Sequence, residues 1–298
     1  MRQPTPAPVR PTLRLPDACE RIALCGGLYS NFAAVEAFLA ATAGRPRFCL
    51  GDLGGFGPHP DRTLDLVRAS GMACIQGNYD RAVGFDERDC GCGYVDPEDR
   101  RTAQVSFDYT ASRTSERHKE WLRELPSQLL LEWRTVRLLL VHGSPDGVNE
   151  FVWESETGDA AIDAWLARER VDGICATHSG IPWIRRTARG FWCNVGVLGR
   201  PSHERSPRVG YAQIDWVPGS RTASPMLVPL RYDVAPVAAA MRTERLPEAF
   251  AVSLETGLWT TCAAILPAAE RVPANRYAPR GAPNEEPDAR HAAAAQGD

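Results

Sequence analysis

Apolar positions follow two different periods through most of the chain. Spacing of three or four residues predicts helices, and these fall at 31–39, 61–68, 116–125 and 159–168. Short apolar runs that end abruptly at glycine or a polar residue predict buried strands, and these fall at 21–25, 47–50, 72–75, 137–141, 171–175, 191–195, 209–215 and 226–230. Strands and helices that alternate first, followed by consecutive strands, are typical of one α/β domain with two facing sheets.

Both ends of the chain lack this patterning. Residues 1–18 are rich in proline and arginine, and residues 271–298 in proline, alanine, glycine and charge. Such segments bury too little apolar surface to fold. We therefore expect a disordered leader over 1–18, a folded domain over 19–270 and a disordered tail over 271–298. The leader lacks the apolar stretch of a secretory signal, and no run reaches the roughly 18 apolar residues that span a bilayer.

Charge and cysteine content narrow the class of protein. The formal net charge is −3 and there is no basic stripe, which disfavours generic binding to nucleic acid or membranes. The nine cysteines are an odd number, which argues against a secreted disulfide framework. Five lie in apolar strand-like runs, where cysteine behaves as a small buried hydrophobe: Cys25, Cys49, Cys74, Cys175 and Cys193. We expect a cytoplasmic protein.

One cysteine pair differs from the others. Cys90 and Cys92 lie in a polar, glycine-rich loop and are separated only by Gly91. This spacing is too tight for an ordinary zinc knuckle. A structural or incidental role is favoured, with redox and metal-binding roles as the alternatives.

Four polar side chains each follow the end of a predicted strand. They are Asp52 in GDLGG, Asn78 in GNYD, His142 in VHGS and His178 in THSG. Side chains at strand ends converge in α/β folds, and this donor set suits a divalent transition metal such as Mn, Fe or Zn. One such residue alone is more often a turn cap or a core residue. Four together favour a metal site.

The segments around these residues resemble the calcineurin-like metallophosphoesterase superfamily, in its bacterial branch of small phosphodiesterases and phosphatases. GDLGGFGPHP at 51–60 resembles the family segment GDxxGYGPxP, and NVGVLGRP at 194–201 resembles NxGSxGxP. The resemblance covers residues 20–266. It implies a four-layer αββα sandwich of two mixed β-sheets flanked by helices, with a two-metal site at the strand ends.

The resemblance also implies that the four strand-end residues hold one metal, with Asp52 shared between both. The second metal normally takes a D-x-H motif and the second histidine of a GHTH motif. This chain has Gly27, Tyr29 and Gly180 at those positions. Because all of the missing residues are ligands of the second metal, we expect a site for a single divalent metal. We also expect the places of Gly27 and Gly180 to be open for substrate or water.

Five further residues are candidates for the chemistry. Tyr79 stands where the family has a histidine that steadies or protonates the substrate, and it would donate a hydrogen bond, as would Tyr29. Filling space is the alternative for both. His59, in the loop after the Asp52 strand, is a candidate general acid or base. Arg200 and Arg208 flank the NVGVLGRP loop and would bind phosphate. An exposed, solvated side chain is the alternative for these three.

Three functions remain open. The first is a single-metal phosphoric-ester hydrolase, either a phosphodiesterase or a phosphatase, acting on a small phosphorylated substrate. The second is a catalytically inactive relative that binds a phosphorylated ligand or a protein partner. The third is a mononuclear non-haem iron enzyme that uses Asp52, His142 and His178 as a two-histidine, one-carboxylate site.

Overall fold

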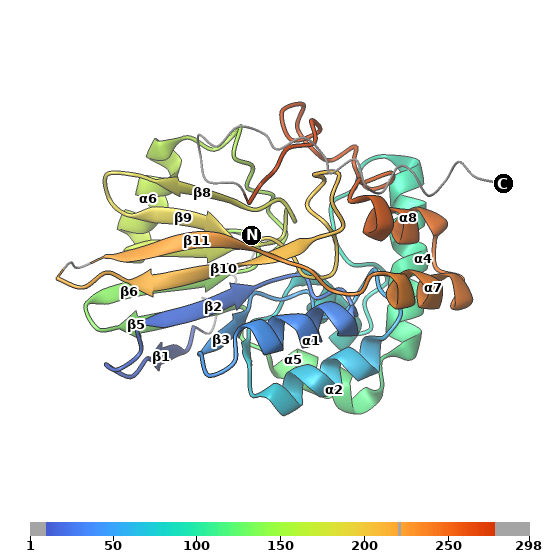
Figure 1. The fold of residues 1–298 in the computed structure, drawn as a ribbon, viewed down its shortest axis with the longest axis horizontal. Coiled ribbons are helices and arrows are strands. Elements are labelled where there is room, and N and C mark those ends of the chain that lie inside the picture. The colour runs from blue at the N-terminus through green and yellow to red at the C-terminus, as the bar shows by residue number, and fades with distance from the viewer. Residues whose placement is uncertain (1–9, 220–221, 278–298) are drawn as a thin grey trace, which may run out of the picture.

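Two mixed β-sheets lie face to face and helices cover their outer faces in this computed structural model, which describes residues 10–219 and 222–277 (Figure 1). The larger sheet has the strand order β1-β5-β6-β7-β9-β8 and the smaller has β11-β10-β2-β3-β4. Helices α1, α2, α3 and α5 lie against the smaller sheet, and α6 against the larger. The predicted sandwich of two mixed sheets flanked by helices is confirmed.

The strands of the larger sheet are β1 (Thr12–Arg14), β5 (Gln128–Trp133), β6 (Val136–Val141), β7 (Gly173–Ala176), β8 (Trp183–Arg186) and β9 (Phe191–Asn194). Those of the smaller sheet are β2 (Arg21–Cys25), β3 (Arg47–Cys49), β4 (Ala73–Cys74), β10 (Val209–Trp216) and β11 (Ala223–Leu230). The helices are α1 (Phe32–Ala41), α2 (Pro60–Ser70), α3 (Asn78–Gly84), α4 (Pro97–Arg113), α5 (Glu116–Glu124), α6 (Asp159–Glu169), α7 (Ala235–Thr243) and α8 (Glu248–Thr256).

Side chains of the central strands point alternately to the two faces of the sheet, and each face packs into its own hydrophobic core. In β6, Leu138 and Leu140 pack between the sheets, whereas Leu139 and Val141 pack with the apolar face of α6. Successive side chains of a strand point to opposite faces, and a strand covered on both faces is apolar throughout. This explains why continuous apolar runs, rather than alternating ones, predicted these strands.

Parallel pairing brings the ends of the central strands together. Strands β2, β3 and β4 run parallel, and so do β6, β7 and β9. The loops that follow β3, β4, β6 and β7 therefore lie at one edge of the sandwich, where parallel strands of α/β folds end and form sites.

The predicted domain boundaries are wrong at both ends. Residues 12–14 form β1, which pairs in parallel with β5, and the next residue, Leu15, is buried. At the other end Tyr277 is buried, and its hydroxyl lies 3.1 Å from that of Ser202. Short segments at both termini thus pack onto the domain. The rest of the predicted leader, residues 1–9, and of the tail, residues 278–298, lies outside the described residues.

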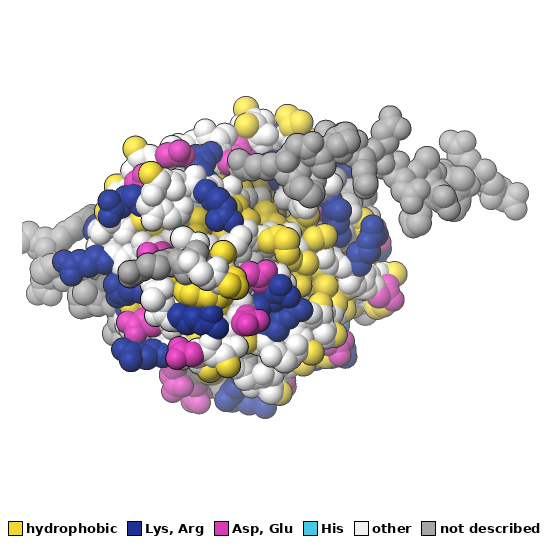
Figure 2. Space-filling view, turned by 60° about the vertical axis from the view of Figure 1, so that its left-hand side comes forward, with side chains coloured by type: hydrophobic (Ala, Val, Ile, Leu, Met, Phe, Trp, Pro, Cys, Tyr) yellow, Lys and Arg dark blue, Asp and Glu magenta, His cyan; other side chains and the backbone are white. Residues whose placement is uncertain are grey.

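Basic and acidic side chains are interspersed over the face drawn in Figure 2, with hydrophobic side chains between them. Among the described residues, no helix combines the length and apolar character needed to cross a membrane.

The five cysteines predicted to be buried are buried thiols, whereas Cys90 and Cys92 are joined in a disulfide.

Candidate metal centre

The loop after β3 is shaped by a close approach between two chain segments. Gly51 has φ +90°, and a Cβ on it would lie 2.4 Å from the backbone nitrogen of Gly77, so only glycine fits. Asp52, with φ +57°, is held by the carboxylate of Asp80, which accepts hydrogen bonds of 2.8 Å from the backbone amides of Asp52 and Leu53. The same carboxylate accepts a bond from Gly77 at the start of α3. Asp80 therefore joins the two loops.

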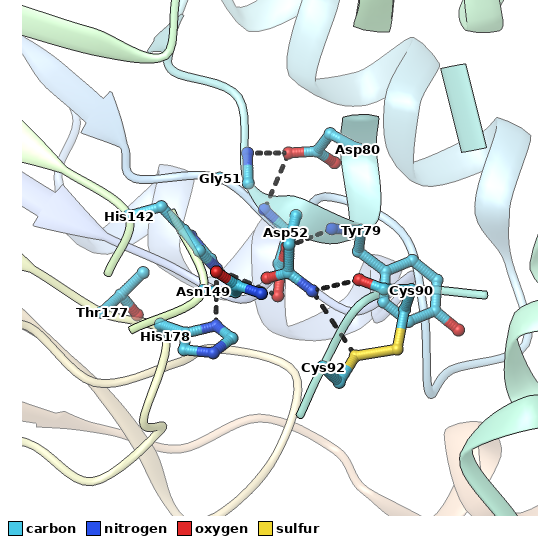
Figure 3. Close-up of polar contacts among 12 residues, drawn as sticks. Gly51, Asp52, Tyr79, Asp80, Cys90, Cys92, His142, Asn149, Thr177 and His178 are labelled. Carbon is cyan, nitrogen blue, oxygen red and sulfur yellow. Dashed lines mark hydrogen bonds and ion pairs between the residues drawn. A yellow bond between two sulfur atoms is a disulfide. The ribbon is translucent and has the colours of Figure 1, made fainter. Parts of the chain in front are cut away.

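Three of the predicted ligands meet at this edge. Nε2 of His142 lies 3.3 Å from Oδ2 of Asp52 and 3.1 Å from Nδ1 of His178 (Figure 3). One ligand atom from each residue lies within 4.8 Å of the other two, and all three side chains are buried. Nδ1 of His142 is 2.6 Å from the carbonyl oxygen of Leu50. A bond from the far ring nitrogen to a carbonyl is how metal-binding histidines are commonly oriented.

Asn78 supplies the fourth predicted ligand from the first turn of α3. Its Nδ2 donates a hydrogen bond of 2.7 Å to the carbonyl oxygen of Cys90. Its Oδ1 is buried and has no hydrogen-bond partner among the described residues. A buried oxygen without a partner costs about 1–3 kcal/mol, and a metal ligated by this oxygen would remove that cost. The donor set of carboxylate, amide oxygen and two imidazoles therefore fits a divalent transition metal.

The pKa shifts of the three titratable ligands favour an ion pair between Asp52 and His142. Burial opposes protonation of His142, but the charge and hydrogen bond of Asp52 outweigh it and raise the pKa of His142 above its usual value. Burial also opposes ionisation of Asp52, and the two histidines outweigh it and lower the pKa of Asp52. Burial and the neighbouring His142 lower the pKa of His178 to about 3. Without metal, these shifts favour an ionised Asp52, a protonated His142 and a neutral His178.

A cavity of about 70 Å³ opens beside these ligands and is lined by Asp52 and His178. Most of its remaining wall is aromatic, formed by Tyr29, Phe56, Tyr79, Tyr94, Phe151 and Phe250. The cavity therefore offers an apolar, planar surface next to the candidate metal centre.

Arg200 lines the same cavity and is a buried cation. It is 5% exposed, and its guanidinium stacks over Trp259 at 3.7 Å from the ring centre. Nη2 donates to the carbonyl oxygen of Thr261, whereas Nε has no partner, and no ion pair joins Arg200 to a described carboxylate. The nearby carboxylate of Asp99 accepts bonds from the backbone amides of Cys262 and Ala264 instead. A buried charge of this kind favours an anionic ligand.

Aromatic rings fill the space expected to be open at Gly27 and Gly180. A Cβ on Gly27 would lie 2.8 Å from Cζ of Tyr29 and 2.4 Å from Cγ1 of Val197, and Gly27 has φ +45°. A Cβ on Gly180 would lie 3.2 Å from Cη2 of Trp259. The expectation of open space there is wrong, because these rings pack against the glycines. A larger side chain at Gly27 would collide with Val197 and Tyr29, and one at Gly180 would have to displace the ring of Trp259.

We expect Gly27→Asp to destabilise the protein by about 1–3 kcal/mol without creating a second metal site, because overpacking displaces Val197 and Tyr29. Urea unfolding and metal content per chain measure the two effects. Gly44→Asp is the matched control, since Gly44 also has positive φ but no atom within 4 Å of the added Cβ. A Gly27→Asp protein as stable as this control, with a second metal bound, would contradict the account.

The structure separates the other predicted residues into two groups. Tyr29, Tyr79 and Arg200 line the cavity, and burial raises the pKa of both phenols, which therefore keep their protons and can donate hydrogen bonds there. His59 precedes α2, is half-buried and is not part of the cavity wall. Arg208 bonds Oε1 of Glu204 at 2.7 Å and is also absent from the wall. The geometry therefore supports the first group only.

Several cavity residues escaped the sequence prediction. Phe250 lies on α8, which was not predicted although Phe250, Ala251 and Leu254 have helical spacing. Ser106 lies on α4, where its hydroxyl is 3.3 Å from that of Tyr79. Helix α4 buries only Asp99, Ser106, Phe107 and Thr110, so it has no apolar stripe that would have revealed it.

Comparison with known proteins decides the family. Residues 20–203 match the family model described as calcineurin-like phosphoesterase. The chain belongs to this family. Metal-dependent hydrolysis of phosphoric esters is the general activity of its members, as the earlier resemblance implied.

Individual relatives of this calcineurin-like phosphoesterase are distant. An uncharacterized protein of Methanocaldococcus jannaschii is 22% identical over 241 residues, which cover 76% of this chain and 94% of that protein. The crystal structure of a metallophosphoesterase from Sphaerobacter thermophilus matches with a TM-score of 0.61 and 22% identity, covering 80% of this chain and all of that one. A hypothetical protein from Pyrococcus horikoshii matches with a TM-score of 0.66 and 19% identity, covering 80% and 98%. At these identities the similarity supports the shared fold.

Proposed function

We propose that the protein is a phosphoric-ester hydrolase, a phosphodiesterase or phosphatase, that uses a single divalent metal. Asp52, Asn78, His142 and His178 would hold Mn, Fe or Zn. The observation that carries the proposal is a single cavity whose wall includes two members of the ligand cluster, Asp52 and His178, together with the buried Arg200. A phosphate ester is the kind of ligand that engages both.

The bound metal would supply Lewis-acid polarisation of a phosphoryl oxygen and a more acidic bound water. The chain's own residues bind and orient the ester. Arg200 donates to phosphate oxygens, and charge-assisted bonds of this kind are strong in a buried setting. The phenols of Tyr29 and Tyr79 donate hydrogen bonds, and the aromatic wall excludes water around the organic part of a small substrate.

Phosphate release from phenyl phosphate and phenol release from diphenyl phosphate by the metal-loaded full chain test the proposal. We expect turnover that depends on added Mn²⁺ or Zn²⁺ and is absent from chelator-treated protein. His59→Ala is expected to keep the rate, because His59 lies outside the cavity wall. Loss of activity in that variant would instead support the acid–base role predicted for His59.

Metal uptake is expected to release a proton from His142. Ligation needs the neutral ring, whereas Asp52 raises the pKa of His142. Below this raised pKa, affinity should fall about tenfold for each unit decrease in pH, and above it this group should have no effect. His178 does not compete for protons near neutrality, since its pKa is about 3. Titration calorimetry in two buffers of different ionisation enthalpy counts the protons, and a count of zero on the acidic side would contradict this assignment.

A binding protein without turnover is the second candidate. The observation that favours it is the packing of Tyr29 and Trp259 against Gly27 and Gly180, the positions where the family normally has ligands of the second metal. Tight binding of inorganic phosphate, with no hydrolysis of either phenyl ester under any metal, would select this function. Iron in the purified protein together with oxygen consumption would select the mononuclear iron enzyme.

A cytoplasmic location is part of the proposal. Its support is the set of free cysteines in the described chain. Cys25 and Cys49 are partners in register on neighbouring strands, yet both remain thiols. In a reducing compartment, a disulfide between Cys90 and Cys92 would have to be reversible.

A further inference from the structure

The disulfide between Cys90 and Cys92 lies beside the candidate metal centre (Figure 3). Cys90 is buried, whereas Cys92 is half-exposed and lines the cavity together with Asp52 and His178. The proposed function does not use this pair. Sγ of Cys92 nevertheless lies 3.5 Å from Nδ2 of the proposed ligand Asn78.

The segment from Cys90 to Cys92 supports Asn78 directly. Nδ2 of Asn78 donates to the carbonyl oxygen of Cys90 at 2.7 Å and to Sγ of Cys92 at 3.5 Å. These two contacts fix the orientation of the amide. Its Oδ1, the predicted ligand atom, is the one left without a partner. The position of the disulfide thus determines where that oxygen points.

A second path leads from the same segment to His178. Nδ2 of Asn149 donates to the carbonyl oxygen of Gly91 at 3.0 Å. The backbone carbonyl of Asn149 in turn bonds the ring of His178 (Figure 3). Two of the four proposed ligands therefore contact the cysteine segment, one directly and one through Asn149.

We propose that Cys90 and Cys92 form a reversible dithiol–disulfide site that exchanges with a dithiol reductant, and that the disulfide form is the one that holds the metal tightly. The coupling to metal rests on the metal centre proposed above. The exchange itself does not, because it needs only an accessible disulfide and a dithiol.

The exchange is balanced in two steps. A thiolate of the reductant attacks Sγ of Cys92, the more exposed sulfur, so that a mixed disulfide forms and the sulfur of Cys90 leaves as a thiolate and takes up a proton. The second thiol of the reductant then attacks the reductant's first sulfur, which is bonded to Cys92 in the mixed disulfide. This step releases Cys92 as a thiol. Two electrons and two protons pass to the protein, and the reductant becomes a disulfide.

Reduction would release the backbone that supports Asn78. Gly91 and Gly93, on either side of Cys92, have φ +60° and +78° and can adopt other conformations readily. Without the sulfur–sulfur bond, the carbonyl of Cys90 and the sulfur of Cys92 can separate. Loss of a partner that orients a metal ligand typically weakens metal binding 10–100-fold.

The test compares metal affinity in the two redox states of the full chain. The protein is equilibrated with mixtures of oxidised and reduced dithiothreitol, desalted without oxygen, and titrated with Mn²⁺ by calorimetry. Alkylation with a maleimide followed by mass spectrometry counts the thiols. We expect the disulfide form to bind Mn²⁺ about 10–100-fold more tightly than the dithiol form.

Two variants make the result specific. Cys90→Ser/Cys92→Ser should bind Mn²⁺ as weakly as the reduced protein and should not respond to dithiothreitol. Cys19→Ser, at a half-exposed free cysteine outside the cavity wall, should behave as the unmodified chain does.

Equal Mn²⁺ affinity in both redox states would overturn the proposal, as would a Cys90–Cys92 pair that never forms a disulfide in oxidised dithiothreitol. Absence of Mn²⁺ binding in both states is a different failure. It would contradict the proposed function and remove the coupling, whereas the thiol count would still establish whether the exchange site exists.

Discussion

Asp52→Ala is expected to abolish metal binding and to lower kcat/KM for phenyl phosphate by more than about a hundredfold. Loss of a group that only orients a ligand costs 10–100-fold in affinity, and Asp52 is itself a predicted ligand. It is also the one carboxylate of the three-residue cluster and the group that raises the pKa of His142. Without it, a cation would meet two imidazoles and an amide with no compensating charge.

Metal content per chain and phosphate release measure these losses. Asp52→Asn is the conservative companion, since it can still accept the 3.0 Å hydrogen bond from the backbone amide of Tyr79 while removing the charge. Asp108→Ala, at an exposed carboxylate on α4, is the matched control and should change neither quantity. An Asp52→Ala protein that keeps its metal and its rate would refute the assignment of the site.

Arg200→Met is expected to weaken phosphate binding while leaving the fold as stable or more stable. The guanidinium of Arg200 is buried without a carboxylate partner among the described residues, and apolar replacement of buried ionic groups is often neutral or stabilising by 1–4 kcal/mol. Hydrogen bonds to charged groups contribute about 1.5–3 kcal/mol. Binding of inorganic phosphate should therefore weaken about 10–100-fold.

Urea unfolding and inhibition by inorganic phosphate separate the two effects. Arg208→Met is the matched contrast, because Arg208 pairs with Glu204, whose side chain is fully buried. Breaking that pair should destabilise the fold by up to about 3–5 kcal/mol without altering phosphate inhibition. If Arg200→Met lost stability as Arg208→Met does and still bound phosphate normally, Arg200 would be a structural residue only.

The ligand set was predictable because it depends on local patterns and one rule of topology. Asp52, His142 and His178 each follow a short apolar strand, and parallel strands of an α/β fold end at a common edge. Asn78 was predicted in the same way, although its strand β4 has only two residues and Asn78 itself starts a helix. Each of these signals lies within a few positions of the residue it predicts.

The cavity wall was not predictable in this way. Phe250 lines the cavity and Trp259 packs behind it against Gly180 and Arg200, both from the region after the last strand, and nothing near the metal motifs indicates this packing. Arg208 and Arg200 looked equivalent in sequence, yet Glu204 and Asn275 bind the first while the second faces the cavity. The partners that decide such roles are set by tertiary packing, which the local sequence does not encode.

Metal stoichiometry tests the central claim most directly. The purified full chain is reconstituted with Mn²⁺, desalted, and analysed for metal per polypeptide alongside Asp52→Ala. The account predicts one metal ion per chain in the unmodified protein and none in the variant. Two metal ions per chain, or none in the unmodified protein, would contradict it.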